Sequence, residues 1–269
     1  MIYVRCVLLA TSLISLLLTC TISVAGDTPD LPVVAANDNR TSAGELKGGQ
    51  LTLWLELRRA HWYPDRETDP SIALHAFGEV GKPPQIPGPL VRVPEGTQII
   101  ASVRNLLPRT VLIHGLHEHP GNSEDTVEVA AGATREVRFE AGVPGTYTYW
   151  ATTSDAQLRT RLTDDMQLSG AFIVDRPGKT VPDRVFVLGL WLPDLGLPRN
   201  NVASVNGKSW PYTERLAMRV GETASWRVIN GTADAHAMHL HGFYFRLGSL
   251  GDGEVDSSFA PDAEPSAVT

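Results

Sequence analysis

Short runs in which apolar side chains alternate with other residues dominate the chain from residue 50 onward. In residues 50–57 a leucine stands at every second position, which is the period of a β-strand with one buried face. Glycine and proline turn signals such as Pro144-Gly145 separate the runs, and no window has a sustained helical period. Similar runs occur at 98–104, 110–113, 135–139, 146–150, 170–174, 184–191, 216–220, 224–229 and 243–247. Many short strands between turn signals predict an all-β fold of the sandwich or barrel kind.

An internal repeat divides the chain into two similar units. In each unit a segment with a glycine turn, a strand that ends in asparagine and a His-Gly pair follow one another, and the offset between the units is 127 residues both at Val93 and Val220 and at His114 and His241. These segments are 91–97, 103–105 and 114–115 in the first unit, and 218–223, 228–230 and 241–242 in the second. The repeat predicts tandem β-sandwiches at residues 50–176 and 183–269. The second is shorter than the roughly 100 residues of a seven-stranded sandwich, so we interpret it as partial and the chain as incomplete.

The alternation also predicts which side chains form the core of the first sandwich. We expect these to point inward: Leu51, Leu53, Leu55, Val103, Phe139, Tyr147 and Phe172. Residues 249–269 are mostly polar and are expected to form a loop, and the adjacent carboxylates Asp164 and Asp165 are expected at the surface.

The first 25 residues resemble a secretory signal peptide. They carry one arginine, an apolar run from Cys6 to Leu18 and a small-residue exit at 23–25, which predicts export to the periplasm or outside the cell. Residues 26–49 lack periodicity, so we expect a flexible lead-in. The two cysteines, Cys6 and Cys20, both fall in the predicted signal. The mature protein would then have neither a disulfide nor a thiolate ligand.

The charge of the chain argues against some classes of partner. The net charge is −7, and lysine and arginine form no run. Nucleic acid and anionic membranes are therefore unexpected partners, and we expect no membrane contact beyond the signal peptide.

Six of the eight histidines fall in two clusters. The first contains His114, His117 and His119, and the second contains His236, His239 and His241. In a strand, His-x-His places two imidazoles on the same face, where they can bind one metal ion or neighbouring ions. Imidazole suits copper, zinc, iron and nickel alike, and a surface cluster without a metal is the alternative. The remaining histidines, His61 and His75, are expected to pack or to form hydrogen bonds on the first sandwich.

The second cluster and its surroundings resemble the multicopper oxidase family. The motif His236-x-x-His239-x-His241-Gly242-Phe243 with the preceding Val205-Asn206-Gly207 is similar to that family's last domain. Segments 145–150 and 170–174 resemble the end of its first domain, and Pro89–Val93 with His114-Gly115 resembles its beginning.

The resemblance implies tandem cupredoxin-like Greek-key sandwiches and copper as the cofactor. It implies electron transfer from a small reducing substrate, through a blue copper, to a trinuclear copper cluster that reduces dioxygen. His236 would then bind the blue copper, and His114, His239 and His241 would serve the trinuclear cluster. We accordingly expect His114 to lie near His239 and His241. Two-domain relatives build the cluster between the subunits of a trimer, so a homotrimer is one expected assembly.

The chain departs from the family pattern at several ligand positions. Leu112 replaces the first histidine of the opening His-x-His, and Trp150-Ala151-Thr152 replaces the second pair. His117 and His119, in the adjacent loop, are the candidates to substitute. The closing His-Cys-His element, which supplies the thiolate of a blue site, is missing.

Three functions therefore compete. The leading interpretation is a multicopper-oxidase-type oxidoreductase whose sequence here is incomplete. The alternatives are a non-enzymatic, copper-free cupredoxin scaffold and a periplasmic protein for copper binding or delivery that uses His117 and His119 together with the second cluster.

Overall fold

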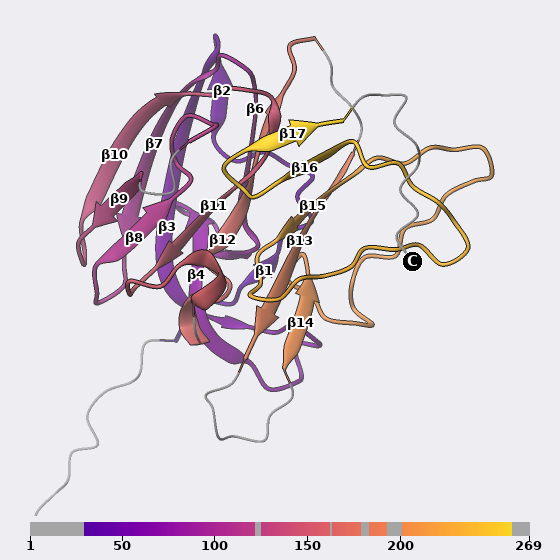
Figure 1. Ribbon diagram of the computed structural model, residues 1–269. Coiled ribbons are helices and arrows are strands. Elements are labelled where there is room, and N and C mark those ends of the chain that lie inside the picture. Colours follow the sequence, from indigo (N-terminus) through magenta and orange to yellow (C-terminus); the bar gives the residue numbers. More distant parts are fainter. Residues whose placement is uncertain (1–29, 122–124, 162, 179–182, 193–200, 260–269) are drawn as a thin grey trace, which may run out of the picture. The chain divides into compact units, whose positions relative to one another are not determined.

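The leucines that alternate from residue 51 onward lie on the longest strand, β3 (Gln50–Trp62). The computed structural model describes residues 30–121, 125–161, 163–178, 183–192 and 201–259 (Figure 1). Strand β3 lies inside a seven-stranded sheet. Its order is β1 (Ala35–Ala36), β5 (Gln85–Ile86), β4 (Ile72–Glu79), β3, β7 (Gln98–Asn105) and β10 (Thr134–Glu140), with β2 (Glu45–Lys47) paired to β3. The predicted signal peptide and both cysteines lie outside the described residues.

A second sheet completes the first sandwich. Its order is β6 (Gly88–Pro94), β12 (Ser169–Asp175), β11 (Gly145–Thr152), β8 (Val111–His114) and β9 (Thr126–Val129). The main core lies between the two sheets and takes leucines from β3 together with Val111 of β8, Tyr147 of β11 and Phe172 of β12. The inward positions are confirmed: six of the seven expected side chains are buried, and Phe139 packs against the same core while partly exposed.

The second unit attaches to the outer face of the first sandwich. Its sheet has the order β14 (Val202–Val205), β13 (Arg184–Trp191), β15 (Trp226–Asn230). Ile173 of β12 packs with Val185, Val187 and Ile229 in a separate buried cluster. Next to it, Arg92 of β6 contacts Asp183 at 2.6 Å, and Arg227 of β15 contacts the same carboxylate at 2.7 Å. The all-β class is confirmed, while the expected domain boundary between residues 176 and 183 stays a prediction.

Two of the strands expected in the second unit do not form. Residues 216–220 and 243–247 are described as irregular and mostly exposed. Alternation describes one strand face, but a strand forms only where a neighbouring strand takes up its backbone hydrogen bonds. The sequence pattern could not show that these runs lack such a partner.

The expected lead-in and the expected terminal loop are also corrected. Residues 31–49 are ordered against the first sandwich: β1 pairs with β5, β2 pairs with β3, and Val34 and Ala43 are buried. Residues 249–258 form a hairpin of β16 (Ser249–Gly251) and β17 (Asp256–Ser258) instead of a loop. Both segments form only short strands at edges of the structure, so neither has the regular alternation of a long half-buried strand. In the part of the chain that the structure describes, no helix is both long and apolar enough to cross a bilayer.

Candidate metal centres

The loop after β8 folds back sharply and carries His117 and His119 of the first histidine cluster. Gly115 begins this turn at a φ of 76°, a left-handed conformation that favours glycine. A Cβ at this position would lie 2.2 Å from the carbonyl oxygen of Thr148. The turn therefore needs glycine, and it places His117 and His119 beside β11.

His119 is buried against aromatic side chains of the core. Its side chain is buried and stacks on Tyr147, with ring centroids 4.3 Å apart and an angle of 8° between the planes. Its Nε2 lies 3.2 Å from the carbonyl oxygen of Gly115. Because a carbonyl oxygen only accepts, Nε2 carries the proton and donates it, and Nδ1 faces the other way with its lone pair.

His117 is oriented in a similar manner. Its Nδ1 donates to the carbonyl oxygen of Glu118 at 2.8 Å, so Nε2 presents the lone pair. Gly121 leaves room for the ring, since a Cβ there would lie 1.8 Å from Cε1 of His117. Both imidazoles thus use one nitrogen to anchor themselves to the backbone of their own loop.

Glu254 reaches these histidines from the turn of the β16–β17 hairpin. Oδ1 of Asp252 accepts hydrogen bonds from the backbone N–H groups of Glu254 at 3.0 Å and Val255 at 2.9 Å, an arrangement that fixes a tight turn. The hairpin is attached to β11 because the Thr146 N–H donates to Oδ2 of Asp256 at 2.7 Å. The carboxylate of Glu254 is thereby placed over the loop that carries His117 and His119.

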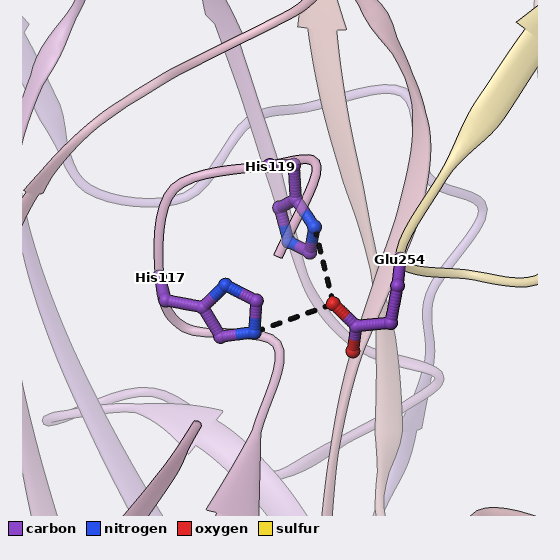
Figure 2. A group of neighbouring side chains, drawn as sticks. All are labelled: His117, His119 and Glu254. Atoms are coloured by element: carbon purple, nitrogen blue, oxygen red, sulfur yellow. Dashed lines mark ion pairs between the residues drawn. The ribbon is translucent and has the colours of Figure 1, made fainter. Parts of the chain in front are cut away.

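The three side chains converge through single atoms, as Figure 2 shows. Oε2 of Glu254 lies 3.3 Å from Nε2 of His117 and 3.5 Å from Nδ1 of His119. All three atoms are buried, and none has a hydrogen-bond partner among the described residues. We call His117, His119 and Glu254 the loop–hairpin centre.

Burial controls the charges in this centre. Burial, and secondly the neighbouring His117, lower the pKa of His119 to about 4, although the nearby backbone groups of Gly115 and Glu254 oppose this. Burial is also the largest influence on Glu254 and raises the pKa of its carboxyl, while His117 acts in the opposite direction. At neutral pH His119 is therefore an uncharged imidazole with an available lone pair, the form that binds metals.

The second cluster has a different character. His239 and His241 are exposed, and their Nε2 atoms lie 3.3 Å apart. We call them the exposed histidine pair. With bonds of about 2.0 Å to one metal ion, this separation corresponds to an angle of about 110° at the metal. His236 lies apart from this contact, since its Nε2 is 2.8 Å from the hydroxyl oxygen of Thr232.

Of the first-domain copper positions that the family resemblance implies, His114 carries an imidazole, whereas Trp150 and Thr152 do not. His114 is stacked on Trp150, with centroids 3.9 Å apart and an angle of 8°. Thr152 is buried, and its hydroxyl group donates to Asp165 at 3.2 Å. Neither an indole nor a hydroxyl with this bond offers an imidazole lone pair. The residues described here therefore fit a copper ion at the exposed histidine pair, but they do not fit a trinuclear cluster.

The outlying histidines behave as expected, whereas one carboxylate does not. His61 contacts Ser71 and His75 contacts Asp165 by hydrogen bonds of 3.0 and 2.8 Å. Asp165, which we expected at the surface, is buried behind β11. Its buried position is decided by the turn that precedes β12 and by its partners His75 and Thr153.

The predicted ligands that lie together in the structure are not the set that the family resemblance implied. Within the described residues, the three-donor group contains His117 and His119 but none of the other four candidates, which are His114, His236, His239 and His241. The proximity of His114 to His239 and His241 stays a prediction. Sequence reasoning missed Glu254 because residues 249–269 were interpreted as a loop. The signal that could have revealed it is Asp252-Gly253, a dipeptide typical of hairpin turns.

Comparisons with known proteins agree with this fold. Two family models, both described as multicopper oxidase, match residues 80–179 and 192–267 and together cover well over half of the chain. A curated relative, the probable nitrite reductase-hydroxylamine oxidoreductase fusion protein of Kuenenia stuttgartiensis, is 27% identical over 65% of this chain and 23% of its own length.

Solved structures of copper proteins have the same fold. The multicopper oxidase mgLAC has a TM-score of 0.54 at 22% identity, covering 72% of this chain and 65% of its own. The blue copper oxidase of Nitrosomonas europaea has a TM-score of 0.52 at 20% identity, covering 68% and 61%. The copper nitrite reductase of Nitrosomonas europaea has a TM-score of 0.56 at 19% identity, covering 78% of each chain. The chain thus spans less than two thirds of the two oxidases and less than a quarter of the curated relative.

These matches establish the fold as cupredoxin-like. The chain belongs to the multicopper oxidase family, a family of copper-dependent oxidoreductases.

Proposed function

We propose that this chain binds copper through the exposed histidine pair and takes part in electron transfer from a small reducing substrate to dioxygen. The observation that carries the proposal is the convergence of Nε2 of His239 and Nε2 of His241 at 3.3 Å on an exposed segment. Copper, when bound by such imidazoles, supplies redox chemistry. The role of this chain is to hold the two rings at a spacing that a single ion can bridge.

Two imidazoles are too few for a complete copper site, so further ligands must join the exposed histidine pair. His114, Trp150 and Thr152 lie at the first-domain positions, and only the first of these has an imidazole. We propose that the remaining donors come from neighbouring copies in a homotrimer. The proposal includes export to the periplasm or outside the cell, because the first 25 residues resemble a secretory signal.

A specific observation favours the alternative of a copper-free scaffold. Trp150, which stands where the family has a ligand, stacks on His114 and has the guanidinium of Arg161 over its ring at 5.4 Å. Arg161 is itself buried and donates to the carbonyl oxygens of Asp165 and Leu168. Aromatic and guanidinium packing therefore occupies this position, which supports a structural role for this part of the first sandwich.

Copper titration of the purified mature chain tests the proposal. We expect Cu(II) to bind with nitrogen ligands, and the double variant His239→Ala, His241→Ala to lose one equivalent of Cu(II). The matched control is His61→Ala, which removes an imidazole that bonds to Ser71. Unchanged uptake in the double variant would contradict copper binding at the exposed histidine pair.

Oxygen consumption with phenols or reduced metal ions separates the oxidase from the scaffold. Copper-dependent oxygen uptake that is lost in the same double variant supports the oxidoreductase. Stoichiometric copper binding without oxygen uptake in any assembly state favours the copper-binding protein, and an absence of binding favours the scaffold.

A further inference from the structure

We propose that the loop–hairpin centre is a mononuclear site for a divalent first-row transition-metal ion, Cu(II) or Zn(II), distinct from the copper positions of the family. The site joins the loop after β8 to the β16–β17 hairpin. It is independent of the exposed histidine pair, so the proposed function can fail without affecting it.

The first argument is the convergence of acceptors. His117 and His119 both donate their other nitrogen to backbone carbonyl oxygens, so the two nitrogens that face Glu254 present lone pairs. The facing atom of Glu254 is a carboxylate oxygen, which is also an acceptor when ionised. Three buried acceptors without a donor are costly unless a cation lies between them.

A proton shared between these groups explains the arrangement less well than a metal ion. Charge-assisted hydrogen bonds between an imidazolium and a carboxylate are about 2.7 to 2.9 Å long. The two contacts of Glu254 are 3.3 and 3.5 Å, and neither has hydrogen-bond geometry. The atoms face one another at a separation that leaves space between them.

That space has the size of a metal ion. The three donor atoms lie within 4.8 Å of one another. The three atoms form a triangle whose two shorter sides are the Glu254 contacts of 3.3 and 3.5 Å. The point equidistant from all three atoms is then at most about 2.4 Å from each of them. Bonds of zinc to nitrogen and oxygen are about 2.0 to 2.2 Å long. Small rotations of His117 and Glu254, which are partly exposed, close the difference.

The surroundings of the donors match those of known metal ligands. Metal-binding histidines usually donate their second nitrogen to a carbonyl or carboxylate oxygen, which fixes the tautomer and the ring orientation. Both histidines do so here, and Tyr147 additionally holds the ring of His119. Two imidazoles and one carboxylate suit Zn(II) and Cu(II) but not Mg²⁺ or Ca²⁺, which prefer oxygen ligands. Three protein ligands leave a further position for water.

The experiment uses the mature chain with His239→Ala and His241→Ala as background, so that the exposed histidine pair does not contribute. After treatment with a chelator, the protein is titrated with Zn(II) and with Cu(II) by calorimetry. We expect one equivalent to bind, and His117→Ala to lower the affinity by about 100-fold or more. Glu254→Gln should lower it by about tenfold or more.

The matched control is Glu118→Gln, which removes the same charge from an exposed neighbour on the same loop. Its affinity should stay within about threefold of the background. Nitrogen hyperfine structure in the spectrum of bound Cu(II) should indicate two imidazoles, reduced to one by His117→Ala. In addition, metal should slow hydrogen exchange in residues 252–255, because the ion ties the hairpin to the sandwich.

The result that overturns the proposal is equal affinity in Glu254→Gln and Glu118→Gln, or no binding of either ion by the background protein. If His117→Ala does not fold, Glu254→Gln still decides the question. Glu254 lies on the turn of a surface hairpin, and glutamine has nearly the same shape as glutamate.

Discussion

The loop–hairpin centre and the exposed histidine pair show that a specific sequence motif need not coincide with buried, well-oriented donor atoms. The pair belongs to the most specific motif of the sequence, yet its imidazoles are exposed and no third donor joins them among the described residues. The loop–hairpin centre has only a weak motif, yet its donors are buried, oriented by backbone hydrogen bonds and joined by a carboxylate from the second unit. A motif records which ligands a family uses, whereas a metal site depends on preorganised donors.

The largest expected difference between the two regions is in stability. His119→Ala removes a buried ring from its stack on Tyr147 and leaves the carbonyl oxygen of Gly115 without its donor, so we expect unfolding to become easier by about 3 kcal/mol. The double variant His239→Ala, His241→Ala should change stability by less than about 0.5 kcal/mol, because both rings are exposed. Urea unfolding in the presence of a chelator measures both values, and equal losses would mean that the contrast in burial is wrong.

Gly121→Ala should weaken metal binding at one centre alone. The added Cβ would lie 1.8 Å from the ring of His117, so the ring must move away from Glu254. We expect a loss of affinity of about 30-fold at the loop–hairpin centre, within the range seen when groups that orient ligands are changed.

Calorimetry on the His239→Ala, His241→Ala background gives this value for Gly121→Ala. Gly248→Ala, just before β16, is the control, since nothing lies within 4 Å of its Cβ position and its φ is not in the left-handed region. Equal affinities in the two glycine variants would show that the position of His117 does not matter for binding.

Asp256→Ala tests whether the centre depends on hairpin attachment. This change removes the acceptor for the Thr146 N–H, a hydrogen bond to a charged group, and should cost about 1.5 kcal/mol. Because Glu254 lies on the same hairpin, metal affinity at the loop–hairpin centre should fall while copper uptake at the exposed histidine pair stays unchanged. Hydrogen exchange across residues 249–258 with and without metal checks this; a protected hairpin in the variant would refute it.

The smallest expected effect concerns the pH dependence of the region around Trp150 and Thr152. Burial, the largest single influence, raises the pKa of Asp165, but hydrogen bonds from His75 and Thr153 outweigh it and keep the pKa below its ordinary value of 3.8. A lowered folded pKa gives stability that is present above the unfolded pKa of about 3.9 and is lost as the pH falls below it.

His75→Ala removes one of the interactions that lower this pKa. The loss of stability on acidification should then be shallower than in the unchanged protein. Urea unfolding at a series of pH values from about 3 to 6 measures the slope. An identical slope would show that the carboxylate of Asp165 does not help to hold this part of the first sandwich.

The sequence by itself determined the family, the all-β class and most of the first sandwich. Alternation placed strands at 98–104, 135–139 and 184–191 and identified the inward side chains, because the period of a buried strand face is a local property of the chain. The sequence also identified His117 and His119 as candidate ligands, because clustered histidines are visible without any knowledge of the fold.

Tertiary structure decided the rest. Whether 216–220 forms a strand, whether 31–49 is ordered and whether Asp165 is buried all depend on partners distant in the sequence. Glu254 becomes a candidate ligand only when the β16–β17 hairpin attaches to β11 through Thr146 and Asp256. The physical reason is that hydrogen bonds and buried charges between remote segments are satisfied only in the folded chain, so a pattern of neighbouring residues carries no record of them.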